Sequence, residues 1–139
     1  MSKYTRSRSV TDYKEIGDRW IKQAVHDLQI AEKNLSIGGF DSAAFYSHQF
    51  VEKLLKGLIS VSGRSIPRTH DLERLGDLLE CTDDIIPDLI DLMGDYQTSR
   101  YPDMNEMIPC EYYTEAIAKD RVRKAQKIFA VMYPEGNNS

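Results

Sequence analysis

The fold is decided by residues 16–58, whose sequence is IGDRWIKQAVHDLQIAEKNLSIGGFDSAAFYSHQFVEKLLKGL. Two stretches of it repeat buried-type residues every three or four positions, which is the spacing of one face of an α-helix. The first stretch contains Ile16, Trp20, Ala24, Leu28, Ala31 and Leu35, and the second contains Phe45, His48, Val51, Leu55 and Leu58. Gly38-Gly39 separates them and is a helix stop, with Asp12 and Asp41 as the expected N-caps. The pattern predicts two antiparallel helices joined by a short turn.

The remainder of the chain also has helical spacing. Thr69 or Asp71 is expected to cap a third helix, whose apolar residues are Leu72, Leu75, Leu78 and Leu79. Thr82 or Asp83 is expected to cap a fourth helix with Pro87 in its first turn and Ile85, Ile86, Leu89, Leu92, Met93 and Tyr96 inward. Residues 98–110 have no regular period and predict a loop, and the last helix runs from about Tyr113 to Met132. We therefore expect an all-α protein, an up-down bundle of four to five antiparallel helices.

The composition indicates an ordinary globular chain of 139 residues, with 41% hydrophobic and 29% charged residues. We expect one domain over residues 12–133, with flexible polar segments at 1–11 and 134–139. The longest apolar run, residues 128–133, is too short to cross a bilayer, and no apolar stretch follows the basic N-terminus. The two cysteines form no C-x-x-C motif. These features predict a cytoplasmic protein without disulfides, metal or cofactor.

The charge is unevenly distributed, although the net charge is only −4. Residues 1–22 carry six basic and three acidic side chains, and residues 119–139 carry five basic and two acidic ones. Residues 71–106 carry eleven acidic and two basic side chains. This polarity can steer a charged partner, or it can reflect solvated helix faces alone. The acidic overall balance argues against a dedicated binder of duplex DNA.

One group of candidate functional residues lies on the second predicted helix. His48 and Glu52 share a face there, and Lys53 and Lys56 lie beside it. A His and a Glu four residues apart can form a hydrogen-bonded pair or supply two metal ligands. Metal sites in helical bundles use repeated Glu-x-x-His motifs, which this chain lacks. The alternative for His48 is a buried ring satisfied by a neighbouring side chain.

Two further groups lie in predicted loops. Arg68 and His70 precede the third helix, where backbone amides attract anions and both side chains add positive charge. The alternative is that the local residues only cap the helix. Arg100, Tyr101 and Asp103 lie in the long loop, where an isolated Arg beside a rigid Tyr-Pro step suits a phosphate or carboxylate. The alternative there is an Arg–Asp pair that holds the loop onto the bundle.

Several catalytic signatures are absent, including Gly-rich phosphate loops, G-x-S-x-G and H-E-x-x-H. Taken together, the motifs resemble those of the HEPN domain family over residues 14–132. The motifs that carry the resemblance are Trp20-x-x-x-Ala24-x-x-Asp27-Leu28, Tyr46-Ser47-His48-Gln49-x-x-Glu52-Lys53-x-Leu55-Lys56, Pro67-Arg68-Thr69-His70-Asp71-Leu72 and Ser99-Arg100-Tyr101-Pro102-Asp103.

The resemblance implies a homodimeric helical bundle that associates with a nucleotide or RNA. It also implies a separate minimal nucleotidyltransferase as partner, in a toxin–antitoxin-like pair. Many members of the family are metal-independent ribonucleases with an Arg-x(4–6)-His motif. Here Arg100 is followed by no His at that spacing, whereas Arg64 and His70 match the spacing but span the loop before the third helix. The resemblance therefore implies a binding module rather than an enzyme.

Three hypotheses follow. The first is a nucleotide-binding module whose site is formed by the candidates His48, Lys53, Lys56, Arg68, His70, Arg100, Tyr101 and Asp103. The second is an endoribonuclease that uses His70 or His48 as general acid/base, and the third is a scaffold that binds only protein. A self-complementary patch at Tyr101, Tyr112 and Tyr113 is expected to support a homodimer.

Overall fold

The computed structural model describes residues 8–103 and 105–137, and all of the regular structure in these residues is helical. This confirms the all-α prediction. The helices of more than one turn are α1 (Val10–Ser36), α2 (Phe40–Val61), α3 (Leu72–Leu78), α4 (Ile86–Met93) and α7 (Glu115–Met132). The short helical turns are α5 (Asp95–Thr98), α6 (Pro109–Tyr112) and α8 (Pro134–Asn137). No helix of this described part is long and apolar enough to cross a membrane.

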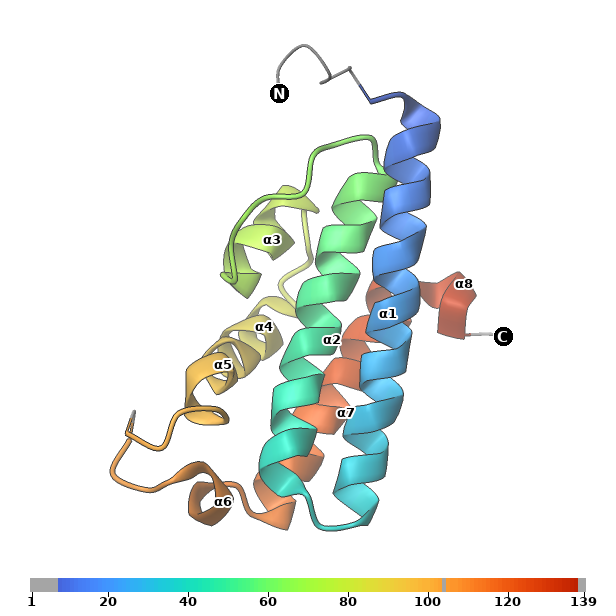
Figure 1. Cartoon of the computed structure of the whole chain (residues 1–139). Coiled ribbons are helices and arrows are strands. Elements are labelled where there is room, and N and C mark those ends of the chain that lie inside the picture. Colours follow the sequence, from blue (N-terminus) through green and yellow to red (C-terminus); the bar gives the residue numbers. More distant parts are fainter. Residues whose placement is uncertain (1–7, 104, 138–139) are drawn as a thin grey trace, which may run out of the picture.

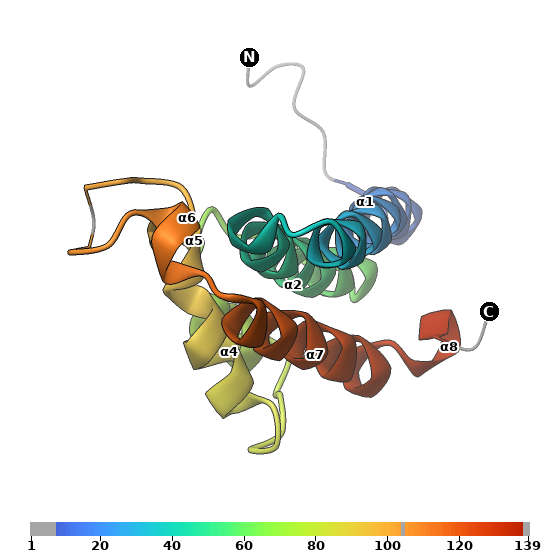
Figure 2. The ribbon, with the colours of Figure 1, turned by 90° about the horizontal axis from the view of Figure 1, so that it is seen from below.

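The helices pack in two layers with α2 at the centre. α1 and α2 run side by side in opposite directions, and α7 lies behind them (Figure 1). The end-on view shows α1 and α2 in one layer and α4 and α7 in the other (Figure 2). α2 contacts α1, α3, α4, α5, α6 and α7, so little of its surface faces solvent. Phe50 of α2 and Phe129 of α7 join the layers with their rings edge to face, 5.4 Å between centroids.

α1 and α2 approach each other most closely at two glycines, Gly17 and Gly57. A Cβ atom on Gly17 would lie 2.5 Å from the Gly57 carbonyl oxygen. A side chain therefore cannot fit there without separating the two backbones. This close approach brings the polar residues of α1 next to those of α2, where Asp27 reaches Lys53.

The hairpin prediction is confirmed, although two of its predicted caps were wrong. Ser9, not Asp12, is the N-cap of α1, and the two residues exchange hydrogen bonds of 3.1 Å in a capping box. Asp41 lies inside the first turn of α2, whose N-cap is Gly39. The predicted cap of α3 at Asp71 is confirmed, because its carboxylate accepts a hydrogen bond from the Arg74 amide.

The region after α3 differs most from the prediction. α4 begins after Ile85 rather than after Thr82 or Asp83, because a turn bonds the Ile85 amide to the Thr82 carbonyl. α4 ends at Met93, and Tyr96 belongs to the separate turn α5. The predicted loop 98–110 contains the start of α6.

The predicted domain boundaries also differ from the observed helix ends. α1 begins at Val10, inside the predicted segment 1–11, and α8 lies inside the segment 134–139. Residues 1–7 and 138–139 lie outside the described residues, so the flexibility of both ends stays a prediction.

A buried polar network fixes α5 against α7. The Asp95 carboxylate accepts hydrogen bonds of 2.6 Å from the Tyr113 hydroxyl and from Arg121 Nε. Burial raises the pKa of Asp95, and the hydrogen bond from Tyr113 and the charge of Arg121 offset only part of that rise. Burial, together with the charge of Asp95, also raises the pKa of Tyr113. Because Tyr113 is buried, it is not part of an exposed self-complementary patch, which corrects the sequence-based expectation.

Candidate functional site

A buried carboxylate on α2 organises the candidate site. The Glu52 side chain is only 7% exposed, and it accepts a hydrogen bond of 3.0 Å from Lys56, one turn further along α2. Nδ1 of His70 lies 3.0 Å from both Glu52 oxygens. Burial by itself would raise the pKa of Glu52, but the hydrogen bonds from His70 and Lys56 outweigh it and lower the pKa. Glu52 is therefore ionised at neutral pH and anchors His70 onto α2.

His70 also packs on an aromatic ring from α5. Its imidazole stacks on Tyr96 with 4.6 Å between ring centroids and 20° between ring planes. The adjacent Asp71 caps α3, which fixes the backbone that carries His70. The His70 side chain is 60% exposed, and its Nδ1 faces Glu52. Nε2 is therefore the ring nitrogen of His70 that is left for a ligand.

Arg100 lies above the same tyrosine ring. Its guanidinium carbon is 4.8 Å from the Tyr96 ring centroid, 5.1 Å from that of Tyr101 and 5.6 Å from that of Phe45. No carboxylate of residues 8–103 or 105–137 forms an ion pair with Arg100, so the alternative of an Arg–Asp pair receives no support there. A guanidinium held by aromatic faces keeps its N–H groups available for an anion.

His48 packs against the same Tyr96 ring that His70 and Arg100 contact. Its ring is fully buried and its centroid is 5.3 Å from that of Tyr96. Neither ring nitrogen has a hydrogen-bond partner among the described residues. Burial lowers the pKa of His48 to about 4; the Glu52 carboxylate opposes this shift, whereas His70 and Lys56 add to it. His48 is therefore neutral at pH 7 and supports Tyr96 by packing.

The structure brings together four of the predicted site residues, His48, Lys56, His70 and Arg100, with Tyr101 beside Arg100. Other candidates lie apart from this cluster or make no contact with it.

Lys53 points to α1, where its ammonium lies 2.5 Å from the buried Asp27 carboxylate. Arg68 and Asp103 are exposed, and among the described residues neither contacts the cluster. Arg64 donates hydrogen bonds to the Leu78 carbonyl and to Ser62, so it does not pair with His70.

Sequence reasoning missed two members of the cluster, Tyr96 and Phe45. Tyr96 was assigned to the apolar face of the fourth helix, because it follows Leu92 and Met93 at helical spacing. The sequence did contain one signal for Tyr96. This residue lies four positions before Arg100, and side chains four residues apart are neighbours on one face of a helical turn. Phe45 carried no comparable signal, because only tertiary packing brings it to Arg100.

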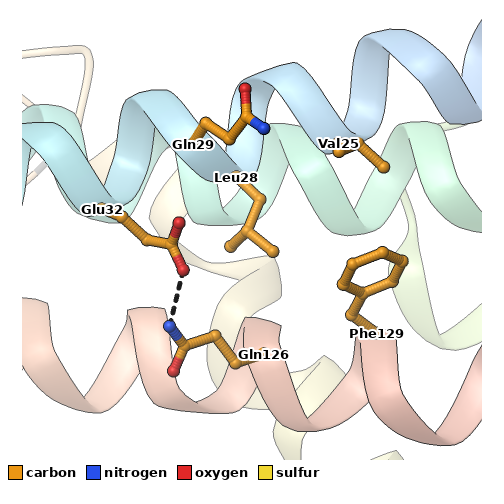
Figure 3. A pocket seen from close by; sticks show the side chains of 6 residues that line it. All are labelled: Val25, Leu28, Gln29, Glu32, Gln126 and Phe129. Atoms are coloured by element: carbon orange, nitrogen blue, oxygen red, sulfur yellow. Dashed lines mark hydrogen bonds between the residues drawn. The ribbon is translucent and has the colours of Figure 1, made fainter. Parts of the chain in front are cut away.

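A groove of about 320 Å³ lies elsewhere, between α1 and α7 (Figure 3). Its lining consists of Val25, Leu28, Gln29, Glu32, Gln126 and Phe129. Gln126 donates a hydrogen bond of 2.7 Å to Glu32 across it. This described lining has no cationic side chain, so it does not match the phosphate chemistry expected from the sequence.

The fold agrees with the comparisons with known proteins. The family model of the HEPN domain matches residues 18–135, so the chain belongs to the HEPN family. The sequence-based resemblance is thereby confirmed. No curated protein matched the chain.

Two solved structures are similar to it. TT1696 from Thermus thermophilus is 30% identical with a TM-score of 0.73, and the match covers 82% of this chain and 93% of that one. ST0689, described as an archaeal HEPN homologue, is 35% identical with a TM-score of 0.71, and the match covers 86% of this chain and 96% of that one.

The buried His48 predicts a pH dependence of folding stability. The unfolded ring has a pKa of about 6.5, whereas the folded value is about 4. Between these values the unfolded chain binds a proton that the folded chain does not, so the free energy of unfolding falls as the pH falls. From pH 7 to pH 5 we expect a loss of about 2 kcal/mol from this group. Urea unfolding at each pH measures it.

The control variants are His48→Gln, which removes the group, and His26→Gln, which removes another histidine, on α1. We expect His48→Gln to have a flatter pH profile than the unsubstituted protein, even if the variant is less stable at pH 7. His26→Gln keeps the steep profile. Parallel profiles for His48→Gln and the unsubstituted protein contradict the prediction. Glu52 does not interfere, because its lowered pKa places its own effect below this pH range.

Proposed function

We propose that this HEPN chain is a nucleotide-binding module whose site is centred on Arg100, Tyr96 and His70. The observation that carries the proposal is the guanidinium of Arg100, which forms no ion pair with the described residues and lies over three aromatic rings, one of which, Tyr96, also stacks on His70. An Arg fork binds phosphate oxygens through two parallel hydrogen bonds, and exposed aromatic rings stack on bases. One site therefore offers groups for both halves of a nucleotide.

Each side chain has a separate role in this proposal. Arg100 binds a phosphate oxygen pair, and Nε2 of His70 donates to or accepts from the same ligand. Tyr101 is 41% exposed and offers a ring for a base or ribose. Lys56 is buried against Glu52, so it holds that carboxylate rather than the ligand. Glu52 in turn orients His70.

Arg100→Ala is expected to weaken nucleotide binding by about 10- to 100-fold, because it removes charge-assisted hydrogen bonds to phosphate. Arg100→Lys should recover only part of the affinity, since an ammonium lacks the fork. Isothermal titration with a panel of nucleoside triphosphates measures both. The matched control is Arg123→Ala, which removes an exposed arginine that pairs with Asp120 on α7. Equal affinities of the protein and Arg100→Ala would contradict the proposal.

The geometry of Glu52 and His70 favours a second candidate function, a metal-independent endoribonuclease. A carboxylate beside Nδ1 fixes the orientation of the imidazole and leaves Nε2 as its exposed nitrogen, which is the geometry that a general base requires. Nε2 would take the proton of a ribose 2′-hydroxyl as that oxygen attacks the adjacent phosphorus. The 5′-oxygen would leave with a proton from water, and Arg100 would stabilise the charge on phosphorus. His48 does not suit this role, because it is buried and neutral.

RNA incubated with the protein in excess EDTA tests this candidate. Cleavage that is lost in His70→Ala and retained in Arg123→Ala, at an exposed residue of α7 outside the cluster, supports it. Glu52→Gln should slow the reaction because the ring loses its carboxylate. Uncleaved RNA after long incubation with the unsubstituted protein rules it out and leaves the binding function.

We also propose, as the family resemblance implies, that two copies pair in the cytoplasm and act with a minimal nucleotidyltransferase. The nucleotide bound at Arg100 would be presented to that partner, in a toxin–antitoxin-like pair. The long loop supports pairing, because Met107 and Ile108 are large apolar side chains exposed on it. An apolar patch of this kind is typical of a surface that another molecule covers.

Sedimentation velocity at micromolar concentration checks the pairing. We expect a dimer for the unsubstituted protein and a monomer for Ile108→Asp, because the charge cannot be buried between two copies. Val131→Asp, at an exposed apolar residue of α7, is the control and should remain dimeric. A monomeric unsubstituted protein contradicts the proposed pairing. Co-sedimentation with an added minimal nucleotidyltransferase tests the partner separately, and its absence contradicts that part.

A further inference from the structure

A second cationic surface lies on α1. Arg19, Lys22 and His26 follow one another at three- and four-residue steps, so they share one face of the helix. With Gln23 they line a hollow of about 500 Å³. An adjoining groove of about 240 Å³ shares Arg19 and Gln23 and adds Trp20 and Lys53. The two hollows share two lining residues and adjoin along α1, and we call them together the α1 groove.

Two of the carboxylates on α1 near the groove are already occupied by other side chains. Asp18 pairs with Lys14 at 3.0 Å. The buried Asp27 accepts hydrogen bonds from Lys53 at 2.5 Å and from Gln23 at 2.9 Å.

Arg19 and Lys22 form no ion pair with any carboxylate of the described part of the chain. Two like charges three residues apart repel each other, so a bound anion would relieve that repulsion. The α1 groove thus offers two cationic side chains, Arg19 and Lys22, without an ion-pair partner among the described residues. They lie next to Gln23 and Lys53, whose side chains are held in place by Asp27.

The α1 groove also contains an aromatic ring. Trp20 is partly exposed and lines the groove, with the Lys56 ammonium 5.8 Å from the centre of its ring. Cations that follow a groove and an aromatic ring within it are the two components of a site for single-stranded nucleic acid. The distance along α1 from Arg19 to His26 is about 10 Å at the helical rise, which exceeds the size of one phosphate group. The length favours a strand over a single nucleotide.

We propose that the α1 groove binds single-stranded nucleic acid, with Arg19 and Lys22 on successive phosphates and a base stacked on Trp20. It is a site separate from the Arg100 cluster and does not depend on nucleotide binding there. Lys56 lies between the two, because its ammonium bonds Glu52 of the cluster and faces Trp20 of the groove.

Trp20 makes the experiment direct, because it is the only tryptophan in the chain. The full chain is titrated with an oligouridylate of about 12 nucleotides, a length within the usual site sizes of such proteins, and tryptophan fluorescence is followed at several salt concentrations. We expect saturable quenching and an affinity that falls as the salt concentration rises. The double variant Arg19→Ala, Lys22→Ala should bind about 10-fold or more weakly, and its slope of log affinity against log salt should be shallower by about 1.4, since each phosphate contact contributes about 0.7.

The matched control is Lys33→Ala with Lys119→Ala, which removes the same charge from exposed positions outside the groove. The proposal is supported if this control retains the affinity and slope of the unsubstituted protein. The proposal is overturned if the control lowers the affinity for the oligouridylate as much as the Arg19→Ala, Lys22→Ala variant does. It is also overturned if a duplex of the same length binds as tightly as the single strand, or if the single strand binds without changing Trp20 fluorescence. Arg100→Ala separates the two sites, because it should weaken nucleotide binding and leave the quenching of Trp20 intact.

Discussion

The packing of α2 on nearly all sides is the constraint on which the rest of the structure depends. A polar side chain buried in such a helix is stabilised by a partner inside the protein, because water cannot reach it; on α2 the exception is His48, whose ring nitrogens have no partner among the described residues. Glu52 meets this requirement by binding Lys56 on its own helix and His70 from the loop before α3. Lys53 meets it through Asp27 of α1. The hydrogen bond that satisfies the buried Glu52 carboxylate therefore also fixes the orientation of the His70 ring, whose other edge is exposed.

The second support of the site is the buried network around Asp95. A helix of four residues such as α5 is too short to persist by itself, because a single helical turn costs more conformational entropy than its hydrogen bonds return. The Tyr113 hydroxyl and the Arg121 guanidinium hold α5 against α7 by binding the Asp95 carboxylate. Tyr96 follows Asp95 directly, so this network fixes the ring on which His70 and Arg100 pack.

The chain belongs to the HEPN family, but its arginine and histidine side chains are not arranged as the spacing of the Arg-x(4–6)-His motif suggests. One pair of residues that matches Arg-x(4–6)-His in the sequence is Arg64 and His70, and the Arg64 guanidinium instead binds the Leu78 carbonyl. The arginine that shares a contact with His70 is Arg100, thirty positions later, because Tyr96 is in contact with both side chains. An arginine and a histidine thus come together through an aromatic ring instead of through spacing in one segment.

The sequence by itself determined the features that depend on neighbouring residues: the hairpin of α1 and α2 from its apolar period and Gly38-Gly39, and a cap of α3 at Thr69 or Asp71, of which the structure has Asp71. It also indicated His70 and Arg100 as cationic groups in loops. It did not determine that Lys53 turns to α1, that Tyr113 is buried, or that His70 binds a carboxylate 18 positions earlier. Helical period and caps act within one or two turns, so local sequence encodes them. Contacts across helices depend on which faces the close approach of the backbones brings together, and only the tertiary structure decides that.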